Sequence, residues 1–127
     1  MSAVQIILLV LGLFIVYTYI KKILVNRSVK HYNPDEAKEK VKNNKNVIML
    51  DVRTSGERQQ QHIKGSFHIP LHEINSRANE LEKFKDKEII CYCRSGNRSV
   101  TAAAKLKKKG FNSANMKGGI IRWNFGK

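Results

Sequence analysis

A segment bounded by a cysteine and an arginine combines residue types that suit anion chemistry. It reads Cys93-Arg94-Ser95-Gly96-Asn97-Arg98 and is followed by Ser99. The segment starts where an apolar run ends and stops where a helical pattern begins, so its backbone N–H groups are expected to turn inward around an anion. Those donors, the helix N-terminus and the arginines all favour a thiolate at Cys93. Cys93 is therefore the predicted nucleophile.

The two cysteines of the chain, Cys91 and Cys93, are separated only by Tyr92. On an extended strand their side chains point the same way and close no useful loop, so no structural disulfide is expected. This usage suits a reducing compartment, where an unpaired thiol is either a buried hydrophobe or a reactive group. Cys91 is expected to be a buried hydrophobe, with a resolving thiol as the alternative.

The elements that must position Cys93 form an alternating pattern of strands and helices. This pattern predicts an α/β fold with a mainly parallel central sheet flanked by helices. Buried strands are predicted at Val47–Val52 and Glu88–Tyr92, because both faces of each carry apolar residues. Helices are predicted from a cap at Asn33 to about Lys42, along an apolar stripe from Ile74 to Phe84, and from Ser99 to Lys109. A strand, a tight loop and a helix thus surround Cys93.

Three stretches in a fixed order resemble the signatures of the rhodanese family. The first comprises Asp51-Val52-Arg53, Glu57, His62-Ile63-Lys64-Gly65-Ser66 and Ile69-Pro70. The second is the Cys93–Ser99 segment, which is similar to the active-site signature of the family, and the third is Gly118-Gly119-Ile120 with Trp123. One departure is Arg58, where the family commonly has an aromatic or apolar residue. The resemblance covers nearly all of the chain after residue 30, and it implies a rhodanese-like domain over residues 31–127.

The resemblance implies a sulfurtransferase that works in two covalent steps. The Cys93 thiolate would take sulfane sulfur from a donor such as thiosulfate and pass it from a persulfide to a thiol or cyanide. Arg94 and Arg98 would hold the anionic group of the donor, and Asp51 and Arg53 would support the site. The expected substrate-binding residues are Arg94, Ser95, Gly96, Asn97, Arg98 and Ser99. No cofactor is implied, and the four histidines show no metal-binding spacing.

Two alternative functions use the same cysteine. A binding module could receive or display persulfide sulfur for a membrane partner with little turnover. Phosphatases and arsenate reductases also use a cysteine loop, but four residues separate Cys93 from Arg98, one fewer than in the phosphatase signature. The smaller cradle favours sulfur over phosphate.

The beginning of the chain predicts a membrane anchor. From Ala3 to Ile20 there is no charged residue, and as a helix this stretch is long enough to cross a hydrocarbon layer of about 30 Å. We assign residues 1–22 to a transmembrane anchor and residues 23–30 to a basic juxtamembrane connector. The lysines and arginines follow the apolar run, which predicts a single pass with the catalytic domain in the cytoplasm. A cleavable signal peptide and a buried soluble helix are the alternatives.

The formal net charge of the chain is +14, from 24 basic and 10 acidic residues. Such an excess favours anionic partners, among them small oxyanions and anionic lipid. Phe84 is the one aromatic residue among the lysine clusters, which is fewer than a nucleic-acid platform requires, so no nucleic-acid partner is expected. The sequence names no protein partner.

Overall fold

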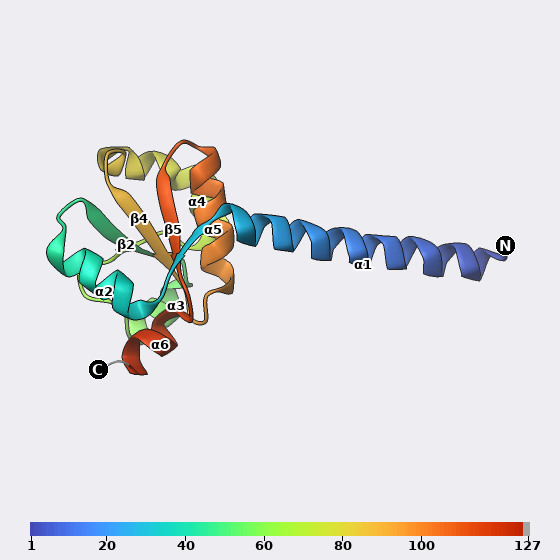
Figure 1. Ribbon diagram of the computed structural model, residues 1–127, viewed down its shortest axis with the longest axis horizontal. Helices are drawn as coiled ribbons and strands as arrows, with labels where there is room; N and C mark the ends of the chain where they lie inside the picture. The colour runs from blue at the N-terminus through green and yellow to red at the C-terminus, as the bar shows by residue number, and fades with distance from the viewer. Residues whose placement is uncertain (126–127) are drawn as a thin grey trace.

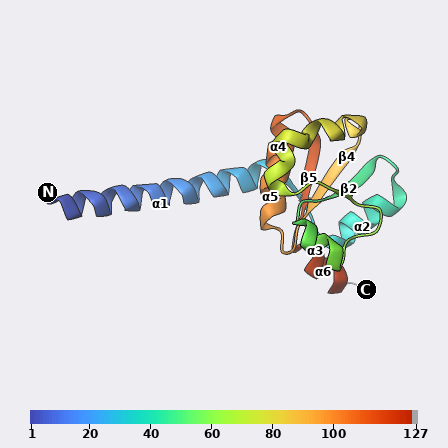
Figure 2. The same ribbon diagram turned by 180° about the vertical axis from the view of Figure 1, so that it is seen from behind.

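A long helix, α1 (Ala3–Ser28), projects from an α/β domain in the computed structural model, which describes residues 1–125 (Figures 1 and 2). The helix runs without a break through the predicted connector at residues 23–30 as far as Ser28. None of its described residues is buried. It is long and apolar enough to cross a membrane. The domain that follows carries the core.

The sheet has five parallel strands in the order β1-β5-β4-β2-β3. The strands are β1 (Lys30–Tyr32), β2 (Val47–Asp51), β3 (Phe67–His68), β4 (Glu88–Tyr92) and β5 (Asn112–Met116). Asp51 lies opposite Tyr92 in the β2–β4 register, and Cys91 lies opposite Asn115 in the β4–β5 register. The prediction of an α/β fold with a parallel sheet is confirmed, and the carboxyl ends of β2 and β4 lie side by side.

Helices cover both faces of this sheet (Figures 1 and 2). They are α2 (Pro34–Asn43), α3 (Ser55–Gln60), α4 (Ile74–Arg77), α5 (Asn97–Lys108) and α6 (Gly119–Phe125). On one face, Ala102 and Leu106 of α5 and Ile74 of α4 pack against the sheet. On the other face, Ala37 of α2 and Ile120 of α6 belong to a second cluster. Every residue of β4 is buried, as expected for a central parallel strand.

Local sequence explains where α2 begins. The Asn33 side chain accepts the backbone N–H of Glu36 at 2.8 Å, and the Glu36 carboxylate accepts the backbone N–H of Asn33 at 3.0 Å. Pro34 occupies the first turn, where its missing N–H leaves no helical bond unmade. This reciprocal cap confirms the predicted helix start.

The predicted helix from Ile74 to Phe84 is not one continuous α-helix. A short 3₁₀ turn at Leu71–Glu73 leads into α4, and a longer 3₁₀ segment follows at Ala78–Phe84. The buried residues of that segment are Ala78, Leu81 and Phe84, each three positions after the last. A spacing of three keeps one face on the core in a helix of three residues per turn. The predicted apolar stripe is therefore confirmed, whereas a continuous α-helix over this range is wrong.

Candidate active site

Cys93 directly follows β4, and the residue is only 1% exposed. The backbone N–H of Gly96 donates to Sγ at 3.0 Å, and Ser99 Oγ lies 3.3 Å from Sγ. Helix α5 begins at Asn97, two residues earlier than the sequence predicted, so Arg98 and Ser99 lie in its first turn. The sulfur therefore faces the N-terminal end of a helix and a turn of inward-pointing amides.

The pKa of the Cys93 thiol reflects two opposing effects. Burial raises it, since a buried charge loses its hydration. Hydrogen bonds to the sulfur outweigh burial, and they hold the pKa below its ordinary value. They come from the Ser99 hydroxyl, when its hydrogen points to Sγ rather than to Asn115, and from the backbone N–H groups of Ser99, Gly96 and Ser95. The arrangement thus favours the thiolate, which is the nucleophilic form.

Two glycines let the chain fold tightly around this loop. Gly96 has φ +107°, a region that L side chains rarely adopt, and it serves as the N-cap of α5. Gly119 has φ +60°, and a Cβ there would overlap the carbonyl oxygens of Cys93 and Arg94. These carbonyls accept the N–H groups of Ile120 at 2.9 Å and Ile121 at 3.3 Å. The start of α6 therefore holds the loop in place through these two backbone hydrogen bonds.

Arg98 is held by a carboxylate of the protein itself. Its guanidinium donates to both carboxylate oxygens of Glu57, at 2.7 and 2.8 Å. The same Glu57 carboxylate accepts from the backbone N–H of Thr54 at 3.3 Å, and so it also caps α3. Hydrogen bonds from Arg98 are the main reason that the pKa of Glu57 is lowered from 4.5 to about 2. The pair ties the first turn of α5 to the first turn of α3.

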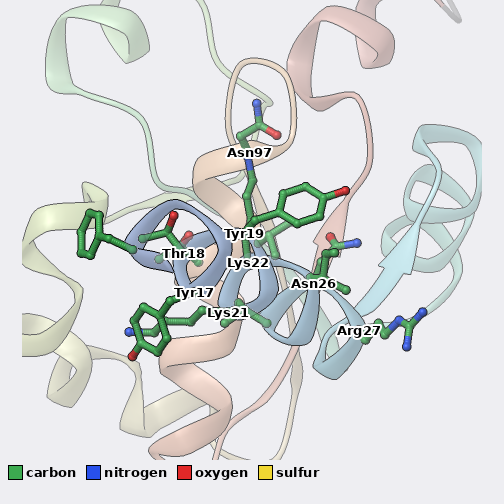
Figure 3. A pocket seen from close by; sticks show the side chains of 13 residues that line it. Tyr17, Thr18, Tyr19, Lys21, Lys22, Asn26, Arg27 and Asn97 are labelled. Atoms are coloured by element: carbon green, nitrogen blue, oxygen red, sulfur yellow. The ribbon is translucent and has the colours of Figure 1, made fainter. Parts of the chain in front are cut away.

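The other predicted substrate-binding residues differ in exposure. Arg94, Ser95 and Asn97 are exposed, whereas Gly96 and Ser99 are buried. The residues at positions 95–97 line one side of a cavity of about 250 Å³. Asn97 also lines a larger groove of about 930 Å³ between α5 and the end of α1. Figure 3 shows that groove, with Tyr19, Lys22 and Asn26 of α1 near Asn97.

Asp51 and Arg53 form a buried ion pair at the end of β2. Arg53 donates to Asp51 Oδ1 from Nε at 3.0 Å and to Oδ2 from Nη2 at 2.8 Å. Burial raises the pKa of Asp51, but the hydrogen bonds and the charge of Arg53 hold it below its ordinary value. The Tyr92 hydroxyl also donates to Asp51 Oδ2, at 3.0 Å. The pair thus meets the last residue of β4, immediately before Cys93.

Arg58, the departure from the family signature, joins this cluster. Its Nη1 lies 3.3 Å from Asp51 Oδ2 and 3.1 Å from Ser66 Oγ, and its Nη2 donates to the Ser66 carbonyl at 2.7 Å. A second cation therefore faces the buried carboxylate. Arg58 thus contributes a charged contact to Asp51 at this position.

Cys91 is fully buried in the core cluster on the α5 face. Burial raises the pKa of its thiol strongly, with a smaller contribution from the nearby Cys93. Such a thiol is inert toward sulfane sulfur at neutral pH. The expectation of a buried hydrophobe is confirmed.

One polar contact of the site, between Ser99 and Asn115, was not predicted from the sequence. The Ser99 hydroxyl donates to Asn115 Oδ1 at 2.5 Å, and Asn115 is only 2% exposed. The one available signal was a large polar residue within the Asn112–Met116 stretch, which the sequence did not predict to be a strand. The role of Glu57 had a clearer signal, because Thr54-Ser-Gly-Glu57 matches the capping-box pattern.

Comparison with known proteins gives one family. The model of the Rhodanese-like domain matches residues 33–125. A sulfurtransferase of Allochromatium vinosum is 33% identical over 96 residues, which cover 75% of this chain and 88% of that protein. A putative sulfur carrier protein of Bacillus subtilis, YrkF, is 39% identical over 97 residues, covering 76% of this chain and 51% of that protein.

A solved structure has the same architecture. The crystal structure of a rhodanese-related protein from Thermoplasma volcanium superposes with a TM-score of 0.69 at 31% sequence identity. The match covers 76% of this chain and 92% of that one. The similarity therefore spans the whole α/β domain.

Proposed function

This chain belongs to the rhodanese-like domain family, and on that premise we propose that it transfers sulfane sulfur through a persulfide on Cys93. The observation that carries the proposal is the environment of Cys93. The residue is buried, its Sγ accepts the Gly96 N–H at 3.0 Å, and the pKa of its thiol is lowered. A stabilised thiolate at the N-terminal end of α5 is what attack on sulfur requires. The sulfurtransferase and sulfur carrier among the relatives support the same chemistry.

The reaction proceeds in two displacements. The Cys93 thiolate attacks the outer sulfur of the donor, so that a new S–S bond forms at Sγ while the bond from that sulfur to the rest of the donor breaks. With thiosulfate as the donor, the bonding electron pair leaves with sulfite. Cyanide or a thiolate then attacks the outer sulfur of the persulfide, and Cys93 leaves as a thiolate. The amides around Sγ stabilise the negative charge at both stages.

We propose that the exposed Arg94 binds the anionic group of the donor. Arg98 shares its charge with Glu57 through two hydrogen bonds, so its proposed contribution is to attract the donor and to hold the loop. Arg94→Ala is therefore expected to raise the KM for thiosulfate several-fold with little change in kcat. Arg98→Ala is expected to lower both kcat and stability, because it also releases α3 from α5. Unchanged thiosulfate kinetics in both variants would refute these roles.

Sulfur transfer is tested on the full-length protein in detergent. Thiocyanate formation from thiosulfate and cyanide is measured for the wild type, for Cys93→Ser and for Cys91→Ala as the matched control. Turnover that is lost only in Cys93→Ser supports the proposal. If no donor, thiosulfate or a persulfide, adds sulfur to Cys93 by intact mass, the proposal fails.

A persulfide carrier is the second candidate, favoured by the 39% identity to the putative sulfur carrier protein. The same experiment separates the two functions. A carrier acquires one sulfur on Cys93 but shows negligible turnover with small acceptors. The short loop, with four residues between Cys93 and Arg98, argues against a phosphatase or arsenate reductase.

We further propose that α1 spans a membrane once, with its basic end and the domain in the cytoplasm. The supporting observations are its 26 residues, its lack of buried residues in the described range Ala3–Ser28 and the cations at its domain-side end. Tyr17 and Tyr19 would then lie at the membrane interface, beside the groove in Figure 3. Protease added to sealed spheroplasts should leave the domain intact. Digestion of the domain while the membrane stays sealed would show that the domain lies outside the cytoplasm. A mature protein that lacks α1 would show that α1 is a cleaved signal sequence.

A further inference from the structure

A chain of hydrogen bonds leads from the buried sulfur of Cys93 to a histidine on β1. Ser99 Oγ lies 3.3 Å from Cys93 Sγ and 2.5 Å from Asn115 Oδ1. Asn115 Nδ2 lies 3.1 Å from His31 Nδ1, and His31 Nε2 lies 2.8 Å from the Asn26 carbonyl oxygen. This series of hydrogen bonds joins α5, β5, β1 and α1. It therefore links the reactive atom to the end of the N-terminal helix.

The direction of each hydrogen bond follows from the far end of the chain. A backbone carbonyl only accepts, so His31 Nε2 must carry the hydrogen that Asn26 receives. A neutral imidazole has one N–H, which leaves Nδ1 as an acceptor for Asn115 Nδ2. The other end of that amide, Oδ1, then accepts the hydroxyl hydrogen of Ser99. Since a hydroxyl has one hydrogen, Ser99 cannot donate to Cys93 in this state.

Protonation of His31 reverses the direction of donation along these hydrogen bonds. Nδ1 then carries a hydrogen and needs an acceptor, which the Asn115 amide supplies when it turns its oxygen toward His31. The amide nitrogen now faces Ser99 and donates to Oγ, so the Ser99 hydrogen is available to Cys93 Sγ. A donor facing the sulfur stabilises the thiolate. The neutral histidine therefore favours the thiol, and the charged histidine favours the thiolate.

We propose that His31 is a positioning residue that sets the ionisation of Cys93 through Asn115 and Ser99. In the coupled change Cys93 releases its proton to water and His31 takes one from water, so the pair changes from two neutral groups to a thiolate and an imidazolium. The proposal deepens the proposed sulfur transfer and rests on it only for its biological use. Because Cys93 leaves as a thiolate when the persulfide is discharged, a protonated His31 would assist that step.

Burial makes the coupling specific. Cys93 is 1% exposed, Ser99 is fully buried and Asn115 is 2% exposed, so water cannot readily replace a missing partner along the chain. His31 is half-buried and lines the cavity of about 250 Å³ described above, which gives its ring a route to solvent protons. The inner groups therefore depend on each other, while the His31 ring can exchange a proton with solvent through the cavity.

The charged groups around His31 come from several elements. Lys117, after β5, is the one other ionisable side chain among the described residues that line this cavity. On β1 itself, Lys30 and Tyr32 both donate to the Glu88 carboxylate of β4, at 2.9 and 2.8 Å. The cavity residues contributed by α1 and α5 are uncharged, and among the described residues no carboxylate lines this cavity. The anion to which hydrogen bonds connect a protonated His31 is thus the Cys93 thiolate, through Asn115 and Ser99.

The test measures the ionisation of Cys93 rather than sulfur transfer. Full-length protein in detergent is alkylated with iodoacetamide across a pH series, and the modified residue is assigned by peptide mass. The rate for one independent thiol rises about tenfold per pH unit below its pKa. In the wild type the rise should be shallower between about pH 6 and about pH 8, because each His31 that loses its proton makes Cys93 less acidic.

Three variants identify the route. His31→Leu and Ser99→Ala should each restore the steep rise of a single thiol, which changes the ratio of the rates at about pH 6 and about pH 8 by about tenfold. The combination of the two should add nothing to Ser99→Ala. His62→Phe, an exposed histidine outside the chain, should keep the wild-type profile. If His31→Leu does not fold, Ser99→Ala alone must still steepen the profile.

Two outcomes would overturn the proposal. A wild-type profile that already matches one independent thiol would mean that the chain does not couple. An effect of His31→Leu that persists in the Ser99→Ala background would mean that the histidine charge acts through space. Either result leaves the sulfur-transfer proposal standing, because alkylation requires no sulfur donor.

Discussion

Two polar clusters occupy the carboxyl ends of neighbouring strands, and they treat negative charge in opposite ways. At the end of β2, the Asp51 carboxylate is already matched by Arg53, Arg58 and the Tyr92 hydroxyl. At the end of β4, the Cys93 loop turns N–H donors toward one sulfur. The first cluster is closed upon itself, whereas the second stabilises charge on an atom that can react.

The difference teaches how stability and reactivity are divided in this domain. Removing one partner of a buried ion pair strongly lowers the free energy of unfolding, because the remaining charge is left without a counter-ion or hydration. A loop that stabilises a thiolate loses little folding energy when its sulfur is replaced by another small group. We therefore expect substitutions in the Asp51 cluster to act on unfolding and substitutions at Cys93 to act on chemistry.

The largest expected effect on stability is that of Arg53→Met. Asp51 is fully buried and Arg53 is 3% exposed, so the substitution strands a carboxylate in the core. The free energy of unfolding should fall by about 3 to 5 kcal/mol. Chemical denaturation followed by Trp123 fluorescence measures the change. The matched control is Arg58→Met, whose side chain is 22% exposed and should cost less than half as much; equal losses would show that Arg53 is not the principal partner.

Gly119→Ala should have the next largest effect. Its φ of +60° and the overlap of a Cβ with the Cys93 and Arg94 carbonyls both oppose a side chain. We expect a loss of about 1 to 3 kcal/mol together with slower alkylation of Cys93 at fixed pH, because the loop must move. Gly56→Ala is the control, since a Cβ at Gly56 meets nothing within 4 Å. If Cys93 stays fully reactive in Gly119→Ala, the contact between α6 and the loop is not needed for the reactivity of Cys93.

The Glu57–Arg98 pair should contribute a smaller stabilisation that depends on pH. The folded-state pKa of Glu57 is depressed from 4.5 to about 2, so its contribution is present above 4.5 and is lost as the pH falls toward about 2. Glu57→Gln should lower the stability by about 1 kcal/mol at neutral pH and have progressively less effect in acid. Denaturation curves at several pH values give this comparison. A difference between the proteins that stays constant with pH would exclude the carboxylate charge as its cause.

Cys93→Ser should change stability least, by less than about 1 kcal/mol, because a hydroxyl can still accept the Gly96 N–H. Sulfur transfer and persulfide formation should both be abolished, because a serine hydroxyl forms no persulfide. Denaturation and intact mass on the same preparation provide the two readings. A large loss of stability would mean that the thiol contributes mainly to core packing. The proposed division between a stabilising Asp51 cluster and a reactive Cys93 loop would then fail.

Much of the fold followed from local pattern. The apolar runs at Val47–Val52 and Glu88–Tyr92 predicted β2 and β4, and Asn33-Pro34 predicted the start of α2. Strand β5 could not be predicted in this way, because Asn112-Ser-Ala-Asn-Met116 is poor in β-branched and aromatic residues. It is a strand because it pairs with β1 on one side and β4 on the other. The tertiary position overrides its weak propensity.

The sequence alone determined that Cys93 is the predicted nucleophile, that a tight loop joins a buried strand to a helix, and that an apolar helix precedes the domain. Each of these depends on neighbours along the chain, whose spacing fixes the local geometry. The tertiary structure decided that Arg98 meets Glu57, 41 residues away, and that Asn115 meets His31, 84 residues away. Such partners are brought together by parallel strands joined through crossovers, and strand order is not written in any local pattern.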